Sequence, residues 1–142
     1  MEEELISMRQ IRDKITFSVL GDYWRKNFKE NLSLIKTSKT VWDLPTFKEP
    51  KPAIAVGAGP SLLKNRSLLQ DWDIMLVASD AAVPMIKQYR TPNYIVSANA
   101  DEPTTPSEFI DNTEEIGLIA PIVVPPDTFR NWRGEIYFYV PH

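Results

Sequence analysis

The sequence contains no cysteine among its 142 residues, and its single histidine, His142, is the last residue. Without cysteine the chain has no disulfide, thiolate zinc site, iron–sulfur cluster or cysteine nucleophile. Without an internal histidine it also lacks a histidine-rich metal centre and an internal Ser-His-Asp triad. Any catalysis must therefore rest on carboxylates, hydroxyls, amides, backbone dipoles or a bound metal ion.

Long apolar runs and an excess of basic charge are missing as well. No apolar run approaches the length that spans a bilayer, and the residues after Met1 are acidic where a signal peptide is basic. The 16 basic and 19 acidic residues give a net charge of −3, which is not the basic footprint of a general nucleic-acid binder. We therefore expect a cytoplasmic protein with no membrane span and no nucleic-acid partner.

The first part of the chain, residues 1–50, is predicted to be an N-terminal helical arm and a linker. Apolar residues recur at three- and four-residue spacing from about Leu5 to Ile35, which indicates helix. Gly21-Asp22 interrupts this pattern and is expected to divide the helix in two or to bend it. The apolar stripe either packs on the domain that follows or docks a second subunit, which would make the protein a homo-oligomer through its N-terminal helices.

Residues 51–142 alternate between short apolar runs and segments of helical pattern. The three prolines within residues 45–52 of the linker argue against helix or central strand there. The alternation predicts an α/β, Rossmann-like doubly wound fold, with helices on both faces of a mostly parallel sheet of about five strands. The chain stops directly after the fifth strand, so we expect a domain truncated at its C-terminus or completed by another chain. The predicted strands are 53–56, 74–78, 94–97, 118–124 and 135–140, and the predicted helices are 61–70, 81–89 and 107–115.

The most informative segment follows the first predicted strand and opens a helix. Its two glycines permit positive φ and let a ligand approach closely, and the proline suits a first helical position. The N–H groups of Ser61 and Leu62, which follow the proline, are expected to point toward an anion, so a nucleotide phosphate is the predicted ligand. A turn in which glycine only serves the geometry is the alternative. The segment is Gly57, Ala58, Gly59, Pro60, Ser61 and Leu62.

This turn is neither of the two common phosphate-binding motifs. Leu62 stands where the dinucleotide fingerprint has its third glycine, and no Gly-Lys-Ser/Thr follows, as a P-loop requires. Generic NAD binding is therefore not expected from this segment.

Polar residues follow the second and third predicted strands. Asp80 is placed either to accept hydrogen bonds from a ribose or to cap the helix that follows it. Asn99, Asp101 and Glu102 follow the third strand, where a ligand bound by the first turn would present its other end. Carboxylate and amide oxygens suit a magnesium ion that bridges phosphates, and a plain polar loop is the alternative. We assign Asp80 and Asn99 to cofactor binding, and Asp101 and Glu102 to the metal.

The sequence resembles the DUF115 family, also called the 6-hydroxymethylpterin diphosphokinase MptE-like family, in residues 53–62, 74–81 and 91–101. Residues 24–32 are similar to the helical lead-in that these proteins often carry. The resemblance implies two chemistries. Archaeal members are magnesium-dependent kinases that move pyrophosphate from ATP to a hydroxymethylpterin. Bacterial members include motility accessory factors, which are implicated in glycosylating flagellin with nonulosonic acids and share a Gly-x-Gly-Pro-Ser turn with CMP-sialic acid transferases.

The leading hypothesis is a transferase of the diphosphokinase type that depends on Mg²⁺ and ATP, with Asp80 and Asp101 as its catalytic residues. Its expected partners are a nucleotide and a small-molecule acceptor. The alternative is a glycosyltransferase using a CMP-sugar, although Ala58 stands where sialyltransferases commonly have asparagine. A third hypothesis is a non-catalytic binding or assembly module.

Overall fold

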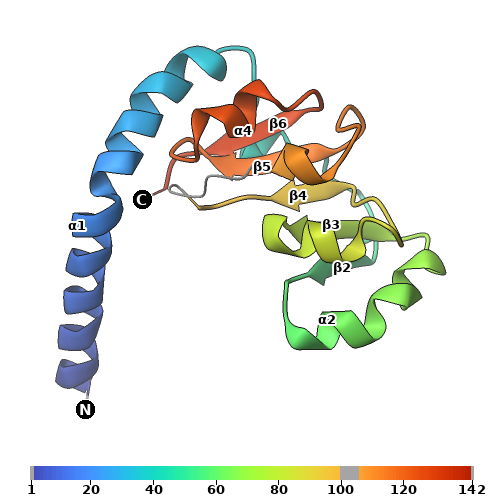
Figure 1. Cartoon of the computed structure of the whole chain (residues 1–142), viewed down its shortest axis with the longest axis horizontal. Coiled ribbons are helices and arrows are strands. Elements are labelled where there is room, and N and C mark those ends of the chain that lie inside the picture. The colour runs from blue at the N-terminus through green and yellow to red at the C-terminus, as the bar shows by residue number, and fades with distance from the viewer. Residues whose placement is uncertain (1, 100–105, 142) are drawn as a thin grey trace.

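The computed structural model describes residues 2–99 and 106–141. Its centre is a six-stranded, all-parallel sheet in the order β1-β6-β5-β4-β3-β2 (Figure 1). The strands are β1 (Lys39–Thr40), β2 (Ala53–Val56), β3 (Met75–Ser79), β4 (Tyr94–Val96), β5 (Gly117–Pro121) and β6 (Ile136–Tyr139). The α-helices are α1 (Glu2–Leu34), α2 (Pro60–Asn65), α3 (Val83–Ile86) and α4 (Pro126–Arg130), and the 3-10 helices are η1 (Val41–Asp43), η2 (Arg66–Gln70), η3 (Asp80–Ala82) and η4 (Pro106–Phe109).

The predicted α/β, Rossmann-like class with an N-terminal helical arm is confirmed. All five predicted strands are present, and the sixth, β1, comes from the predicted linker and adds to the edge of the sheet beside β6. The ammonium of Lys39 lies 2.9 Å from a carboxylate oxygen of Glu135, at the start of β6. This hydrogen bond and the charge of Glu135 raise the pKa of Lys39. A two-residue strand carries too short a pattern to be recognised in the sequence.

The buried side chains gather on one face of the sheet. Val56, Ala78, Ile95 and Leu118 are partners across four neighbouring strands, so their side chains point to the same face. Residues of η2, α3 and α4 pack against them in two hydrophobic clusters. Strands β2 to β6 lie in the sheet in the same order as in the chain. Right-handed crossovers between such strands all run in one direction and place their helices on the same face of the sheet, which explains why the burial is on one face. In the described residues, the helices that reach these clusters therefore lie over one face, which differs from the expected helices on both faces of the sheet.

The arm is one helix, so the predicted division into two helices at Gly21 is wrong. A glycine inside a long helix weakens it by only about 1 kcal/mol, which the rest of a 33-residue helix tolerates. The C-terminal half of α1 lies against the domain and its N-terminal half extends away from it (Figure 1). The fully buried Asn31 anchors the docked half, because its amide nitrogen donates to the carbonyls of Ile122 and Val124 at 2.6 and 2.8 Å.

The helices between the strands are shorter than the sequence pattern predicts. The segment expected to be one helix over 61–70 forms α2 and continues as the 3-10 helix η2. Of the helix expected over 107–115, the structure has only the 3-10 helix η4. The five-residue helix α4 was not predicted, because prolines before and within it conceal a segment too short to show helical periodicity.

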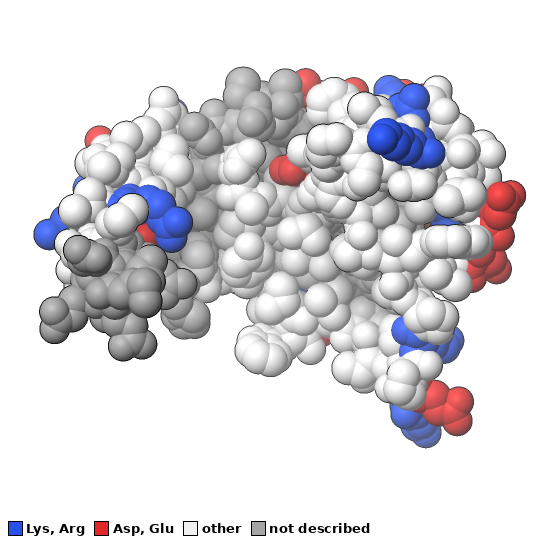
Figure 2. All heavy atoms as spheres, turned by 90° about the horizontal axis from the view of Figure 1, so that it is seen from below, with Lys and Arg blue, Asp and Glu red and all other residues white. Residues whose placement is uncertain are grey.

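Two further observations concern the length of the helices and the charge of the surface. Among the described residues, no helix combines the length and the hydropathy that crossing a membrane requires. On the face shown in Figure 2, lysine and arginine side chains lie in separate small groups with a broad uncharged area between them. This face therefore carries no continuous basic patch of the kind that nucleic acid selects.

Candidate functional site

Three neighbouring strands end beside one another at the carboxyl edge of the sheet. Gly57 follows β2, Asp80 follows β3 and Ser97 follows β4, and these strands are adjacent in the sheet. The register pairs Val56 with Ala78, and Ser79 with Val96. The residues that follow these pairs therefore share the carboxyl edge of the sheet, although β2, β3 and β4 are sequential neighbours and the strand order does not reverse between them.

The predicted phosphate-binding turn begins α2 as expected. Gly59 is the N-cap residue, with extended backbone angles, and Pro60 is the first helical residue. The amide of Leu62 donates to the carbonyl of Gly59 at 3.0 Å, so the expectation that this amide points toward a ligand is wrong. The amides of Ala58, Gly59 and Ser61 donate no hydrogen bond to another described residue. Three donors of the turn therefore remain for an anion.

The two glycines of the turn leave space rather than relieve backbone strain. No glycine in the described ranges has a positive φ, so the expected need for positive φ at Gly57 and Gly59 is wrong. A Cβ added to Gly57 would meet nothing within 4 Å, and one added to Gly59 would lie 3.9 Å from the Ser61 hydroxyl. The space beside both residues is open, as close approach of a ligand requires.

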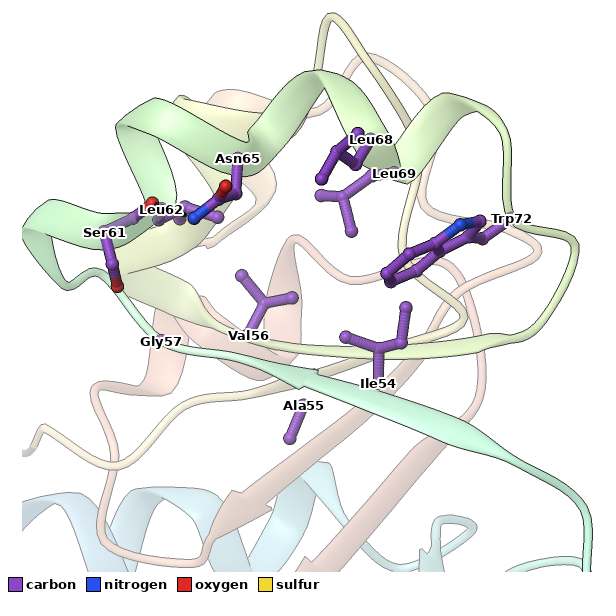
Figure 3. A pocket seen from close by; sticks show the side chains of 10 residues that line it. All are labelled: Ile54, Ala55, Val56, Gly57, Ser61, Leu62, Asn65, Leu68, Leu69 and Trp72. Carbon is purple, nitrogen blue, oxygen red and sulfur yellow. Dashed lines mark hydrogen bonds between the residues drawn. The ribbon is translucent and has the colours of Figure 1, made fainter.

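The turn forms the polar end of a pocket of about 240 Å³ between β2 and the α2–η2 segment (Figure 3). The Ser61 hydroxyl points toward the strand end at Gly57, and the Asn65 side chain lies one turn further along α2. Asn65 donates to the Ser61 carbonyl at 3.0 Å, which fixes its amide. The opposite end is apolar, and the pocket is lined by Ile54, Ala55, Val56, Gly57, Ser61, Leu62, Asn65, Leu68, Leu69 and Trp72.

Asp80 is held by groups on two sides. One carboxylate oxygen accepts the amide of Ala81, the next residue, at 2.7 Å. The N-cap residue of η3 is Ser79, without a side-chain cap bond, so the capping role predicted as one alternative for Asp80 is wrong. The other oxygen accepts the Ser97 hydroxyl at 2.8 Å. Each oxygen keeps a further lone pair for a ligand. Ser97 was missed in the sequence, where it reads as the last residue of a strand and gives no sign that it faces Asp80.

The remaining predicted residues lie after β4. Asn99 is exposed and has no regular structure. Asp101 and Glu102, the predicted metal ligands, lie outside the described residues. Within residues 2–99 and 106–141, no group of three or more His, Cys, Asp and Glu side chains is arranged to hold a metal ion. Asp80 is therefore the one predicted carboxylate whose surroundings are described.

A second hollow at the same edge was not predicted. It has a volume of about 730 Å³ and lies between α1 and the ends of β4, β5 and β6. Ala98, the residue after Ser97, lines it, whereas Ser97 and Asp80 do not. The aromatic residues of α1 repeat at helical spacing, but only the fold brings them opposite Tyr139. Its walls are Phe17, Trp24, Arg25, Phe28, Lys29, Ala98, Pro121, Val123, Tyr139, Val140 and Pro141.

The fold and this edge define an α/β protein with a Rossmann-like parallel sheet and ligand-sized hollows at its carboxyl end. Over residues 26–142 the chain matches the family described as 6-hydroxymethylpterin diphosphokinase MptE-like, and it belongs to that family. Comparisons with curated proteins and with solved structures each found no match. The match begins within α1, so the docked half of this helix is part of the family domain.

Proposed function

We propose that this chain is a nucleotide-dependent transferase of the diphosphokinase type and that the 57–62 turn holds the phosphates of ATP. The observation that carries the proposal is the open turn after β2. Its amides at Ala58, Gly59 and Ser61 have no partner among the described residues, and the space beside Gly57 is empty. Unbonded amides at the end of a parallel strand favour a phosphate, because they supply hydrogen bonds without rearrangement.

The family description names a diphosphokinase, which transfers the terminal two phosphates of ATP as one unit. In this chemistry an acceptor hydroxyl attacks the β-phosphorus, the bond between that phosphorus and the α-phosphate oxygen breaks, and AMP leaves. The hydroxyl proton needs a base, and we assign this role to the Asp80 carboxylate. Its hydrogen bonds to Ser97 and Ala81 fix its orientation, so no reorganisation is needed when it accepts the proton.

A magnesium ion, when bound, would neutralise charge on the phosphates. Asp101 and Glu102 would hold it, since oxygen ligands suit this ion. Asn99 would lie beside the nucleotide. These assignments follow from the position of the three residues after β4 in the chain.

The second hollow, between α1 and the ends of β4, β5 and β6, is our candidate for the acceptor site, and we call it the groove beside α1. Strands lie about 4.8 Å apart, so the turn after β2 and the groove at β5 are separated by about 14 Å along the edge, with Asp80 between them. The aromatic side chains of Trp24, Phe28 and Tyr139 line the groove. A flat heteroaromatic acceptor, such as the hydroxymethylpterin in the family description, would stack on such walls.

Nucleotide binding is tested by thermal unfolding of the chain with ATP and Mg²⁺, ATP with a chelator, CMP, and NAD. We expect a rise in melting temperature with ATP and Mg²⁺. A rise with CMP alone would favour the glycosyltransferase alternative, and no rise with any nucleotide would favour the non-catalytic module. Ser61→Asp should abolish the rise, because it places a carboxylate where the phosphate binds.

The matched control is Ser67→Asp, which adds the same charge at an exposed position of η2 that does not line the pocket. We expect this variant to bind like the unmodified protein. If both variants bind ATP equally, the phosphates lie elsewhere and the proposal is wrong. Formation of AMP in the presence of an acceptor, measured for the wild type and for Asp80→Asn, then tests the transfer step itself.

A further inference from the structure

The long helix α1 carries two apolar faces that point in different directions. The first docks the C-terminal half of the helix onto the domain through Asn27, Asn31 and Ile35, all of which are buried. These residues follow one another at four-residue spacing, so they lie on one side of the helix. The docked face accounts for the packing of α1 against α4 and the loop after β5.

The second face is a stripe on the free half of the helix, and its members are between 51% and 69% exposed. At 100° per residue these side chains fall within an arc of about 120°, whose centre is about 140° from that of the docked face. The stripe therefore faces away from the domain, and Figure 1 shows no other element beside this half of α1. We call this set the outer stripe: Met8, Ile11, Ile15, Val19 and Tyr23.

An exposed stripe of this length needs a partner. From Met8 to Tyr23 it extends about 22 Å along the helix, with two charged residues, Arg12 and Asp22, within the same arc. A projecting helix has no tertiary packing to stabilise it, and helices of this length are marginal alone in water. Contiguous apolar surface of this kind marks an interaction site.

The charge along α1 indicates what the partner is. The helix begins with three glutamates, Glu2 to Glu4, and carries both signs of charge over residues 9–22. Towards its end Arg25, Lys26 and Lys29 outnumber the acidic Glu30. A second copy in parallel orientation would place like charges side by side. An antiparallel copy places the acidic start of one helix along the basic stretch of the other.

We propose that two copies of this chain associate through the outer stripes of antiparallel α1 helices. A two-fold axis near Ile15 places Ile11 of one copy opposite Val19 of the other, and Met8 opposite Tyr23. Such a contact uses the same surface twice and closes on itself, so it produces a dimer and not a filament. The two domains then lie at opposite ends of the helix pair.

The test is the molar mass of the full chain in solution, measured by light scattering and sedimentation equilibrium across a dilution series. We expect twice the monomer mass of 16.3 kDa. Ile15→Asp places two like charges at the two-fold axis, and we expect it to reduce the mass to that of the monomer. Gln10→Asp is the matched control, since this exposed residue lies on the other side of the helix, and it should remain dimeric.

A second pair of variants tests the orientation. Lys26→Glu should weaken the dimer, and adding Glu4→Lys to the same chain should restore it, because the two positions face each other in the antiparallel arrangement. Circular dichroism and thermal unfolding verify that the variants fold, so that loss of the dimer is not loss of structure. The proposal is overturned if the wild type is a monomer or if the dimer survives Ile15→Asp. It is also overturned if the chain is a monomer that sediments with lipid vesicles and Ile15→Asp abolishes this sedimentation.

Discussion

The hydroxyl of Ser97 donates a 2.8 Å hydrogen bond to the Asp80 carboxylate and thereby links the carboxyl ends of β4 and β3. Ser97 is only 4% exposed, and its own amide donates to the carbonyl of Ile119 on β5 at 3.0 Å. The hydroxyl therefore has little freedom to turn elsewhere. The Asp80 carboxylate is therefore held by the sheet itself at the carboxyl edge of the strands.

The first prediction concerns this pair. Ser97→Ala removes a donor from a half-buried carboxylate and should lower the free energy of unfolding by about 1–2 kcal/mol. Asp80→Ala, which removes both acceptor oxygens, should also destabilise the protein. In the double variant the two effects should fall short of their sum by about 1 kcal/mol, because each single change already breaks the same bond. Urea unfolding of all four proteins measures this coupling, and simple additivity would show that the bond contributes nothing.

The second prediction concerns the anchor of α1. Asn31→Ala leaves the carbonyls of Ile122 and Val124 buried without their donor, so we expect a loss of about 1–3 kcal/mol in unfolding free energy. Asn31→Asp should be worse, because a carboxylate would then face two carbonyl oxygens. Both values come from chemical denaturation.

Ser33→Ala on the same helix is the control for Asn31. Its exposed hydroxyl bonds only to the nearby carbonyl of Glu30, so the change should stay within about 0.5 kcal/mol of the wild type. Equal effects of Asn31→Ala and Ser33→Ala would mean that the docking of α1 does not depend on the buried amide.

The third prediction separates two glycines by what a methyl group would meet. At Gly134 a Cβ would collide with the backbone carbonyls of Thr113 and Ile116, so Gly134→Ala should destabilise the fold by about 1–3 kcal/mol. At Gly57 the space is open, and Gly57→Ala should be neutral or stabilising by up to about 1 kcal/mol.

The same Gly57→Ala variant should nevertheless weaken nucleotide binding, because its methyl group occupies the space proposed for the phosphate. Melting temperatures with and without ATP and Mg²⁺ measure both effects on one sample. A variant that keeps the full ATP-dependent rise would show that the ligand does not approach Gly57.

The fourth prediction is a dependence on pH at the turn after β1. The Asp43 carboxylate accepts the backbone N–H of Thr40 at 2.8 Å and its hydroxyl at 2.9 Å, and these bonds lower the pKa of Asp43. A carboxyl whose pKa is lower in the folded state stabilises the fold above its unfolded pKa, about 4. That contribution is lost as the pH falls through the folded pKa.

We therefore expect the difference in unfolding free energy between the wild type and Asp43→Asn to shrink as the pH is lowered from about 6 to about 3. An NMR titration of the Asp43 carboxyl gives its pKa directly. Thr40→Val keeps the amide but removes the hydroxyl, so it should leave a smaller depression of this pKa. A difference between wild type and variant that is independent of pH would contradict the assignment.

How far the sequence predicts the fold differs from one element to the next. The strands β2 to β6 were located because buried parallel strands form apolar runs that need no tertiary information to recognise. The sequence predicted a helix over 107–115 where the structure has only η4, and it did not predict α4. Short helices are stabilised by what they pack against and not by their own periodicity. Gly21 was expected to divide the helix or to bend it, and α1 is not divided there, because the neighbouring turns hold Gly21 in helical conformation.

The candidate site was likewise predicted from the sequence only in part. The sequence located the glycine turn and Asp80, because the strand ends and turns that carry them are marked by neighbouring residues in the chain. It did not reveal that Ser97 would hold Asp80, or that Leu62 would bond back to Gly59. The groove beside α1 was also invisible, since its walls come from four separate segments of the chain.

Local sequence by itself thus determined the class of the fold, the lack of cysteine and of internal histidine, and the place of the glycine turn after β2. Only the tertiary structure decided which polar groups face one another, which amides remain free, and which side of α1 meets the domain. The reason is physical: strand and turn preferences depend on neighbouring residues in the chain, whereas hydrogen-bond partners and cavities depend on segments that only folding brings together.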